Sequence, residues 1–184
     1  MAAVIAEFLA ATLVNTSVLA AAASAHKRRI ELFARNVELC RITEDCIFTD
    51  LYREAPLNRW TSPHLDADKR AFEADSALKV AAQARKYQFL TAAQALTHGD
   101  LHTGSIMLTA HETRVIDAEF AFMGPIGFDV GAVIGNLLLA YCAQEGHEAA
   151  PHARDAYRAW ILDQVVAVWA GFHDRFLALW RQAS

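Results

Sequence analysis

The chain has 184 residues, of which 54% are hydrophobic and 21% charged, and its formal net charge is −4. This length and apolar content suit one compact domain with a core of its own and exclude a disordered chain. Because the charge balance is slightly acidic, the chain lacks the basic footprint of a nucleic-acid-binding protein. Four prolines in the whole chain favour a mainly helical structure.

The N-terminal 25 residues are apolar and rich in alanine. No Lys or Arg precedes them and Glu7 interrupts them, so we expect a helix over residues 3–23 rather than a secretory leader. No stretch reaches ~18 uninterrupted apolar residues, so we also expect no membrane span. Three cysteines without metal-site spacing favour a reduced, cytoplasmic setting.

Further helical segments follow. A short helix is expected over residues 27–35, and Asn36 is a candidate N-cap for a helix that begins near Val37. Inward-facing side chains of that helix are expected at Leu39, Ile42 and Phe48. Residues 53–66, with Pro56 and Pro63 among them, predict a loop, and a long helix is expected over 67–90.

The pattern changes after residue 100. Short β-type runs at 105–108 and 113–116 predict a small hairpin, and glycines and a proline at 124–127 predict a turn. The helix expected over 128–144 is apolar nearly all round, which predicts burial. The last helix, over 152–182, carries an aromatic stripe that we assign to the core. These elements predict one domain over residues 1–184 that is mainly α with a small β-hairpin, an α+β fold.

Three carboxylates and two histidines gather around this hairpin. The segment His98-Gly-Asp-Leu-His102 comes first, and Asp117-Ala-Glu119 follows the second strand. If the second segment is extended, residues i and i+2 point to the same side, so Asp117 and Glu119 could face one small cavity. Paired carboxylates suit Mg²⁺, which also takes oxygens from substrate phosphates.

The remaining polar residues have assignable roles around this pair. Asp100 is the candidate catalytic base, which would accept the proton of an attacking hydroxyl. His98 and His102 are assigned to support of the loop through backbone hydrogen bonds. Asp129, at the start of a helix, could act only as an N-cap, although a role in bracing the loop is preferred.

At these residues the chain resembles the kinase-like phosphotransferases that include the aminoglycoside and choline kinases. It is similar above all to the methylthioribose kinase family, over nearly its whole length. The motifs that carry this resemblance are Glu38-Leu-Cys-Arg-Ile-Thr-Glu-Asp45, His98-Gly-Asp-Leu-His-Thr-Gly-Ser-Ile106, Val115-Ile-Asp-Ala-Glu-Phe-Ala-Phe122, Gly124-Pro-Ile-Gly-Phe-Asp129 and Gly135-Asn-Leu-Leu-Leu-Ala140.

The resemblance implies the C-terminal lobe of a protein-kinase-like fold, which would use ATP and Mg²⁺ to phosphorylate the 1-hydroxyl of a thio-sugar in methionine salvage. It implies Asp100 as the base and Asp117 and Glu119 as metal ligands. Ser105 stands where the wider superfamily usually has a metal-binding Asn, and it is assigned to support of the loop rather than to the metal. Ala118 replaces an expected Pro. A homodimer is also implied.

All eight glycines lie between Gly99 and Gly171, so residues 1–98 hold no glycine-rich loop for nucleotide phosphates. The family's ATP-covering N-terminal lobe is therefore expected to be absent from this chain, and the chain to be part of an enzyme.

Three other readings stay open. One is a related kinase with an aminoglycoside, choline or homoserine substrate. Another is a folded lobe without catalytic activity. The last is a dinuclear metallohydrolase, because His-x-Asp-x-His also resembles a zinc or manganese ligand set.

Overall fold

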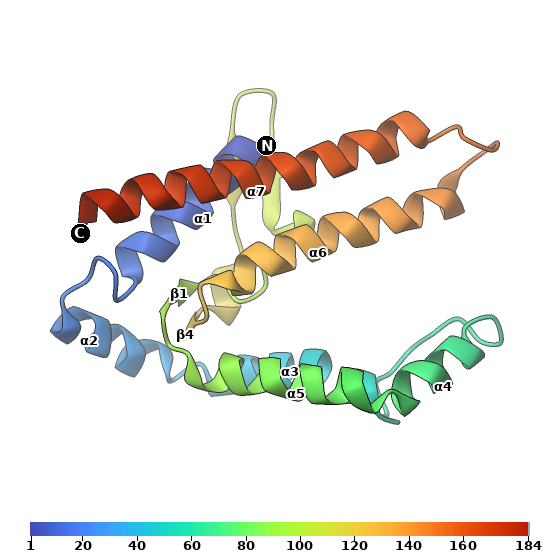
Figure 1. The fold of residues 1–184 in the computed structure, drawn as a ribbon, viewed down its shortest axis with the longest axis horizontal. Helices are drawn as coiled ribbons and strands as arrows, with labels where there is room; N and C mark the ends of the chain where they lie inside the picture. Colours follow the sequence, from blue (N-terminus) through green and yellow to red (C-terminus); the bar gives the residue numbers. More distant parts are fainter. Residues whose placement is uncertain (184) are drawn as a thin grey trace.

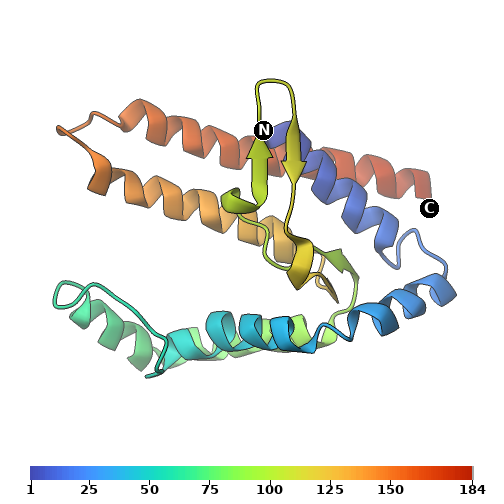
Figure 2. The same ribbon diagram turned by 180° about the vertical axis from the view of Figure 1, so that it is seen from behind.

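The computed structural model describes residues 1–183, which form a mainly helical fold with two small antiparallel sheets. The α-helices are α1 (Ala2–Thr16), α2 (Ala23–Phe33), α3 (Val37–Phe48), α4 (Asp66–Ala74), α5 (Ser76–Thr91), α6 (Gly127–Ala143) and α7 (Asp155–Ala183). In both views α6 lies between α7 on one side and the layer of α3, α4 and α5 on the other (Figure 1 and Figure 2). The expected fold class, mainly α with a small hairpin, is confirmed.

Each sheet has two strands. Strands β2 (Ile106–Leu108) and β3 (Thr113–Val115) form the expected hairpin, in which Ile106 pairs with Val115. The second sheet was not expected: β1 (Ala95–Thr97) pairs with β4 (Phe122–Gly124). Strands of three residues carry almost no periodic signal, and here the pairing joins segments far apart in the chain. This second sheet connects the segment before the His-Gly-Asp motif to the segment after the Asp-x-Glu motif.

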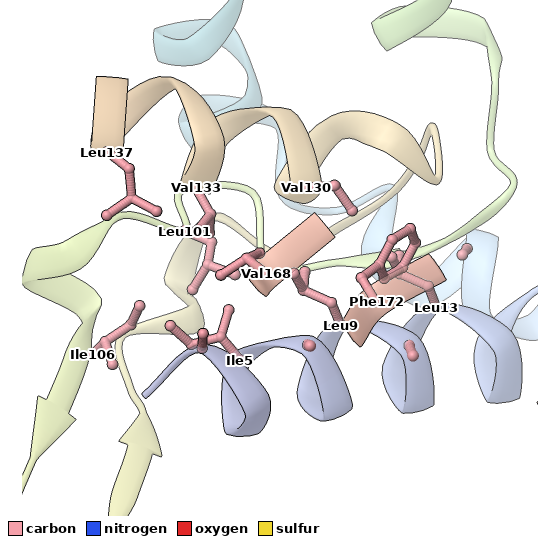
Figure 3. Packing of buried hydrophobic residues seen from close by; sticks show 14 of the residues in the cluster. Ile5, Leu9, Leu13, Leu101, Ile106, Val130, Val133, Leu137, Val168 and Phe172 are labelled. Carbon is pink, nitrogen blue, oxygen red and sulfur yellow. The ribbon is translucent and has the colours of Figure 1, made fainter. Parts of the chain in front are cut away.

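The main core lies where α1 crosses α7. Ile5, Leu9 and Leu13 of α1 pack in one buried cluster with Val168 and Phe172 of α7. Figure 3 shows α6 closing this cluster from another side and Leu101 reaching into it from the loop after β1. Leu101 is completely buried, so the residue next to Asp100 is anchored in the core.

The first helix is shorter than expected, because it ends at Thr16 and not near residue 23. The side chains of Thr16 and Ser17 account for this end. The Ser17 hydroxyl donates to the Val14 carbonyl and accepts from the Leu19 N–H at 3.0 Å. The Thr16 hydroxyl accepts from the backbone N–H of Leu96 at 2.9 Å, which joins the helix end to β1. Local polar side chains here compete with the helical backbone bonds.

The single helix expected over 67–90 is two helices. Asp75 separates α4 from α5 in a non-helical conformation, and its carboxylate accepts from the Leu78 N–H at 2.9 Å as an N-cap. Aspartate is among the preferred N-cap residues, so this break follows a known local preference that helical periodicity hides.

The expected burial of the last two helices is only partly correct. On α6 the buried side chains are those of Asp129, Val130, Val133 and Leu137, whereas Leu139 is 71% exposed. The aromatic residues of α7 are divided in the same way: Phe172 is buried, and Trp169 is 52% exposed. Val168 and Phe172 lie four residues apart on the face of α7 that packs in the core cluster, so Trp169 falls on another face of the helix.

Among the described residues, Gly127–His147 is the one helical stretch whose length and composition alone would allow it to cross a membrane. A single stretch of this kind is weak support for a span. In this structure its Val130, Val133 and Leu137 lie in the core cluster, and the expectation of no membrane span stays a prediction.

Two valines on α7 provide a matched test of the core. Val168 is completely buried and Val166 is 67% exposed. We expect Val168→Ala to lower the free energy of unfolding by about 2–3 kcal/mol, because it removes buried methyl groups and leaves a cavity. Val166→Ala should change it by about 0.5 kcal/mol or less. Urea unfolding of the two variants checks this, and equal losses would contradict the assigned core.

Candidate functional site

The loop after β1 places an acid at the surface between buried neighbours. His98 is 3% exposed and Leu101 is completely buried, whereas the Asp100 side chain is 55% exposed. Gly99 between them has φ of +87°, a conformation that side chains other than glycine rarely adopt. The backbone therefore turns sharply here, and Asp100 faces outward from a loop whose flanks are fixed.

A buried carboxylate holds this turn. Asp129 of α6 accepts from the backbone N–H of His98 at 2.6 Å and from that of Gly99 at 3.0 Å. Burial raises the pKa of the Asp129 carboxyl above its ordinary value, and the two backbone hydrogen bonds oppose this rise. Asp129 therefore braces the loop as preferred from the sequence, and the N-cap position of α6 is held by Ile126 and not by Asp129.

His98 connects this loop to the acidic segment. Its Nδ1 lies 3.4 Å from the backbone nitrogen of Asp100 and accepts from that N–H, so Nε2 carries the proton and donates to the Ile116 carbonyl at 2.8 Å. Ile116 directly precedes Asp117. The His98 ring thus connects the backbone at Asp100, the candidate base, to the backbone next to Asp117, the first candidate metal ligand.

The acidic segment is not an extended strand, so the geometric basis of the predicted metal pair is wrong. Strand β3 ends at Val115, Asp117 has the left-handed φ of 67°, and Ala118–Phe120 form a short 3₁₀ turn that contains Glu119. The i, i+2 alternation of a strand does not apply to such a turn. A left-handed conformation at a residue other than glycine costs energy and is typical of functional sites.

Close backbone packing sets the two acidic segments side by side. A Cβ atom on Gly99 would overlap the carbonyl oxygen of Phe120. Asp100 follows Gly99, and Glu119 precedes Phe120, so the two acids flank the point of closest approach.

Asn36 holds the acidic turn from the other side. It is the N-cap residue of α3, as expected, but its side chain makes no capping bond to that helix. Instead its Nδ2 donates to the carbonyl oxygens of Glu119 at 2.8 Å and Ala121 at 3.0 Å. The residue types at 36 and 119 carry no sign of this contact, which only the folded chain creates.

The other two supporting residues lie within the loop. The Ser105 hydroxyl donates to the Asp100 carbonyl at 3.2 Å, and the Ser105 carbonyl accepts from Ile116 N–H at 3.0 Å. His102 Nδ1 accepts from Gly104 N–H at 3.0 Å, which leaves the proton on Nε2, 3.7 Å from Asp100 Oδ2. Both residues therefore hold the loop through backbone contacts close to the candidate base.

Within residues 1–183 no three His, Cys, Asp or Glu side chains gather into a metal-ligating group. This finding argues against the dinuclear metallohydrolase, which needs such a group. A Mg²⁺ ion has a smaller requirement, because it is usually held by one or two carboxylates together with substrate phosphates and water. The exposed carboxylates of Asp117 and Glu119 on a braced turn suit that chemistry.

A cavity of about 930 Å³ opens beside Asp100 between α3, α5 and α6. Its apolar wall includes Ile42, Ile47, Phe128 and Leu139. Ile42 was expected to face the core of the protein, but it is 46% exposed and lines this cavity. Asp100 is the one carboxylate among its lining residues.

Comparison with known proteins assigns the chain to a family. Residues 3–180 match the family described as the phosphotransferase enzyme family. The chain belongs to that family. It is 48% identical over 177 residues to methylthioribose kinase 1 of Oryza sativa subsp. japonica, 50% identical over 176 residues to a methylthioribose kinase of Escherichia coli O45:K1, and 46% identical over 173 residues to one of Yersinia pestis strain Pestoides F.

These alignments cover 96%, 96% and 94% of this phosphotransferase-family chain, but only 41%, 42% and 42% of the relatives. The chain thus spans about two fifths of the length of the curated relatives that it matches. The family match over residues 3–180 shows that the chain belongs to the family. Whether the chain has the activity of a whole methylthioribose kinase is taken up below as a proposal.

The contact between Gly99 and Phe120 can be tested with a single methyl group. We expect Gly99→Ala to lower the free energy of unfolding by about 2–5 kcal/mol, because it adds both a left-handed alanine and a backbone overlap. Gly146→Ala is the control, since nothing lies within 4 Å of the added methyl there. Thermal unfolding of both variants is the measurement. A Gly99→Ala variant as stable as Gly146→Ala would show that the two segments do not pack as described.

The raised pKa of Asp129 has a consequence for stability. A carboxyl whose pKa is higher in the folded chain than its ordinary value of 3.8 favours folding most when it is protonated. The contribution of Asp129 to the free energy of unfolding is therefore complete at pH values below the ordinary pKa. It is lost as pH rises through the raised pKa of the folded chain.

We expect the stability of the unmodified chain relative to Asp129→Asn to fall as pH increases through this window and then to level off. Urea unfolding of both proteins from about pH 3 to about pH 7 measures the difference, in which the titration of other groups cancels. A difference that grows with pH in this window would contradict the raised pKa.

Proposed function

We propose that this chain is the catalytic lobe of a protein-kinase-like methylthioribose kinase, which transfers a phosphoryl group from ATP to the 1-hydroxyl of methylthioribose in methionine salvage. The observation that carries the proposal is the position of Asp100. It lies exposed beside a mainly apolar cavity, on a loop packed against the turn that holds Asp117 and Glu119. The identities of 46–50% to proteins named methylthioribose kinase support the choice of substrate.

In this mechanism the substrate hydroxyl binds at Asp100. Its oxygen forms the new bond to the γ-phosphorus of ATP, the bond from that phosphorus to the bridging oxygen breaks, and ADP leaves. Asp100 accepts the hydroxyl proton as the new bond forms. When bound, Mg²⁺ neutralises charge on the phosphates, and Asp117 and Glu119 are the residues that would hold it.

Rigid positioning of Asp100 supports this role. His98, Ser105 and Asp129 all bond to the backbone of the loop, so little movement is needed when substrate binds. Phosphoryl transfer depends mainly on position and charge stabilisation, and such bracing serves both.

The composition of the cavity favours a thio-sugar over an aminoglycoside. A polycationic aminoglycoside would need several carboxylates around it, and Asp100 is alone among the lining residues in carrying one. The apolar wall from Ile42, Ile47 and Leu139 suits the methylthio end of the smaller sugar. Phosphoryl transfer to methylthioribose, an aminoglycoside, choline and homoserine, measured side by side, decides between these substrates.

The remaining features of the proposal concern assembly and location. We propose that residues 1–184 act as one lobe, that the protein forms a homodimer and that it works in the cytoplasm. Cys46 and Cys142 are exposed and unbridged, which suits a reducing compartment.

Asp100→Asn provides the direct test. Phosphoryl transfer from Mg-ATP to methylthioribose is measured with the chain alone and with the chain joined to the N-terminal part of a methylthioribose kinase. We expect the variant to lose about 10²–10⁴-fold in kcat, because it cannot accept the proton.

Asp174→Asn, an exposed carboxylate on α7, is the matched control and should keep full activity. Near-normal turnover by Asp100→Asn would rule out the assigned base. If neither unmodified protein transferred a phosphoryl group, the result would favour the alternative that the chain is a folded lobe without catalytic activity.

A further inference from the structure

Asn136 is a polar residue of α6 that lines the same cavity as Asp100 and His102. Its side-chain oxygen is held by the loop, because Oδ1 accepts from the backbone N–H of Thr103 at 3.0 Å and from the Thr103 hydroxyl at 2.8 Å. A backbone N–H can only donate, so the atom that it meets must be the amide oxygen. The orientation of the Asn136 amide is therefore determined by its partners.

This orientation leaves two donors unused. Since the amide is planar, Nδ2 lies on the side turned away from Thr103, and no acceptor within residues 1–183 takes its protons. Nδ2 is thus a hydrogen-bond donor held in a fixed direction at the wall of a cavity, with its orientation already set before a ligand binds. Such donors discriminate between ligands, because an analogue without the matching group leaves them unpaired.

Gln94, another amide in the lining of this cavity, is oriented in the same way by the backbone N–H of Ile126 at 3.0 Å. Asn136 differs from it because its partner Thr103 belongs to the loop that carries Asp100.

The carboxylate of Asp100 offers hydrogen-bond acceptors, and Arg85, another lining residue, donates to Gln88 at 2.7 Å. A ligand with several hydroxyls on one small ring could match both groups, one hydroxyl giving its proton to Asp100 and another accepting from Asn136. A ribose-type sugar has this arrangement.

We infer that Asn136 is a specificity-determining residue, whose Nδ2 donates a hydrogen bond to the 2- or 3-hydroxyl of the sugar while Asp100 faces the hydroxyl that is phosphorylated. The inference rests on the proposed function and deepens it, because it names the group that recognises the sugar ring. It also explains why Thr103, in the loop of the base, is bonded to a helix of the cavity wall.

The test compares three sugars by isothermal titration calorimetry: methylthioribose and its analogues without the 2-hydroxyl or the 3-hydroxyl. The unmodified chain should bind methylthioribose roughly tenfold more tightly than one of the two analogues. In Asn136→Ala this ratio should fall to about one, because the donor that reads the hydroxyl is gone. A purely structural role would weaken all three sugars equally and leave the ratio unchanged.

Thr103→Val is the control variant. It removes the hydroxyl bond to Oδ1 but keeps the backbone N–H bond, so the amide stays oriented and the ratio should stay near that of the unmodified chain. A second measurement needs no variant: the side-chain amide NMR signals of Asn136 should shift when methylthioribose is added, and much less with the analogue that lacks the recognised hydroxyl.

An unchanged ratio in Asn136→Ala, or Asn136 amide signals that respond equally to all three sugars, would overturn the inference while leaving the proposed function intact. Absence of binding of every sugar both to the unmodified chain and to the chain joined to the N-terminal part of a methylthioribose kinase would overturn both.

Discussion

The site depends on the contact between Gly99 and the carbonyl of Phe120, where two backbone segments meet with no room for a side chain. Chain connectivity alone would leave the His-Gly-Asp loop and the Asp-x-Glu turn free to lie apart, since a whole hairpin separates them. Pairing of β1 with β4 brings the flanks of the two segments together, and the bond from His98 to Ile116 keeps them in register. Each of these interactions acts on backbone atoms, so the carboxylates remain available for chemistry.

Local signals in the sequence predicted most of the scaffold. Helical periodicity, the hairpin pattern and the polar cluster indicated the class of fold and the region of the site, because each reflects residues close together in the chain. The errors occur where distant segments compete with local preference. The Thr16 hydroxyl at the end of α1 bonds to Leu96. The Asn36 side chain, at the N-cap position of α3, bonds to Glu119 and Ala121 and not to the backbone of that helix.

The turn that holds Asp117 and Glu119 also differs from what the local sequence predicted. The residue types at 117 and 119 indicated a metal site, but the assumed extended backbone was wrong because Asp117 adopts a left-handed conformation. Aspartate adopts that conformation more often than most residues other than glycine, but the sequence alone does not indicate which aspartates do so. Asn136 is a comparable case, because the sequence analysis names it only within the motif Gly135-Asn-Leu-Leu-Leu-Ala140, and its contact with Thr103 depends on the packing of α6 against the loop.

Helix α6 has two roles: it holds the loop of the candidate base, and it lines the cavity. Asp129 near its start holds the loop of the candidate base, and Asn136 and Leu139 further along line the cavity. Seven residues of α-helix separate Asp129 from Asn136, which corresponds to roughly 10 Å along a stiff rod. Any substitution in the wall that tilts or slides this rod also displaces the turn at Gly99. Substitutions on α6 that change substrate specificity would therefore also disturb the position of Asp100. Substitutions on the α3 and α5 sides of the cavity can change substrate specificity while Asp100 stays in place.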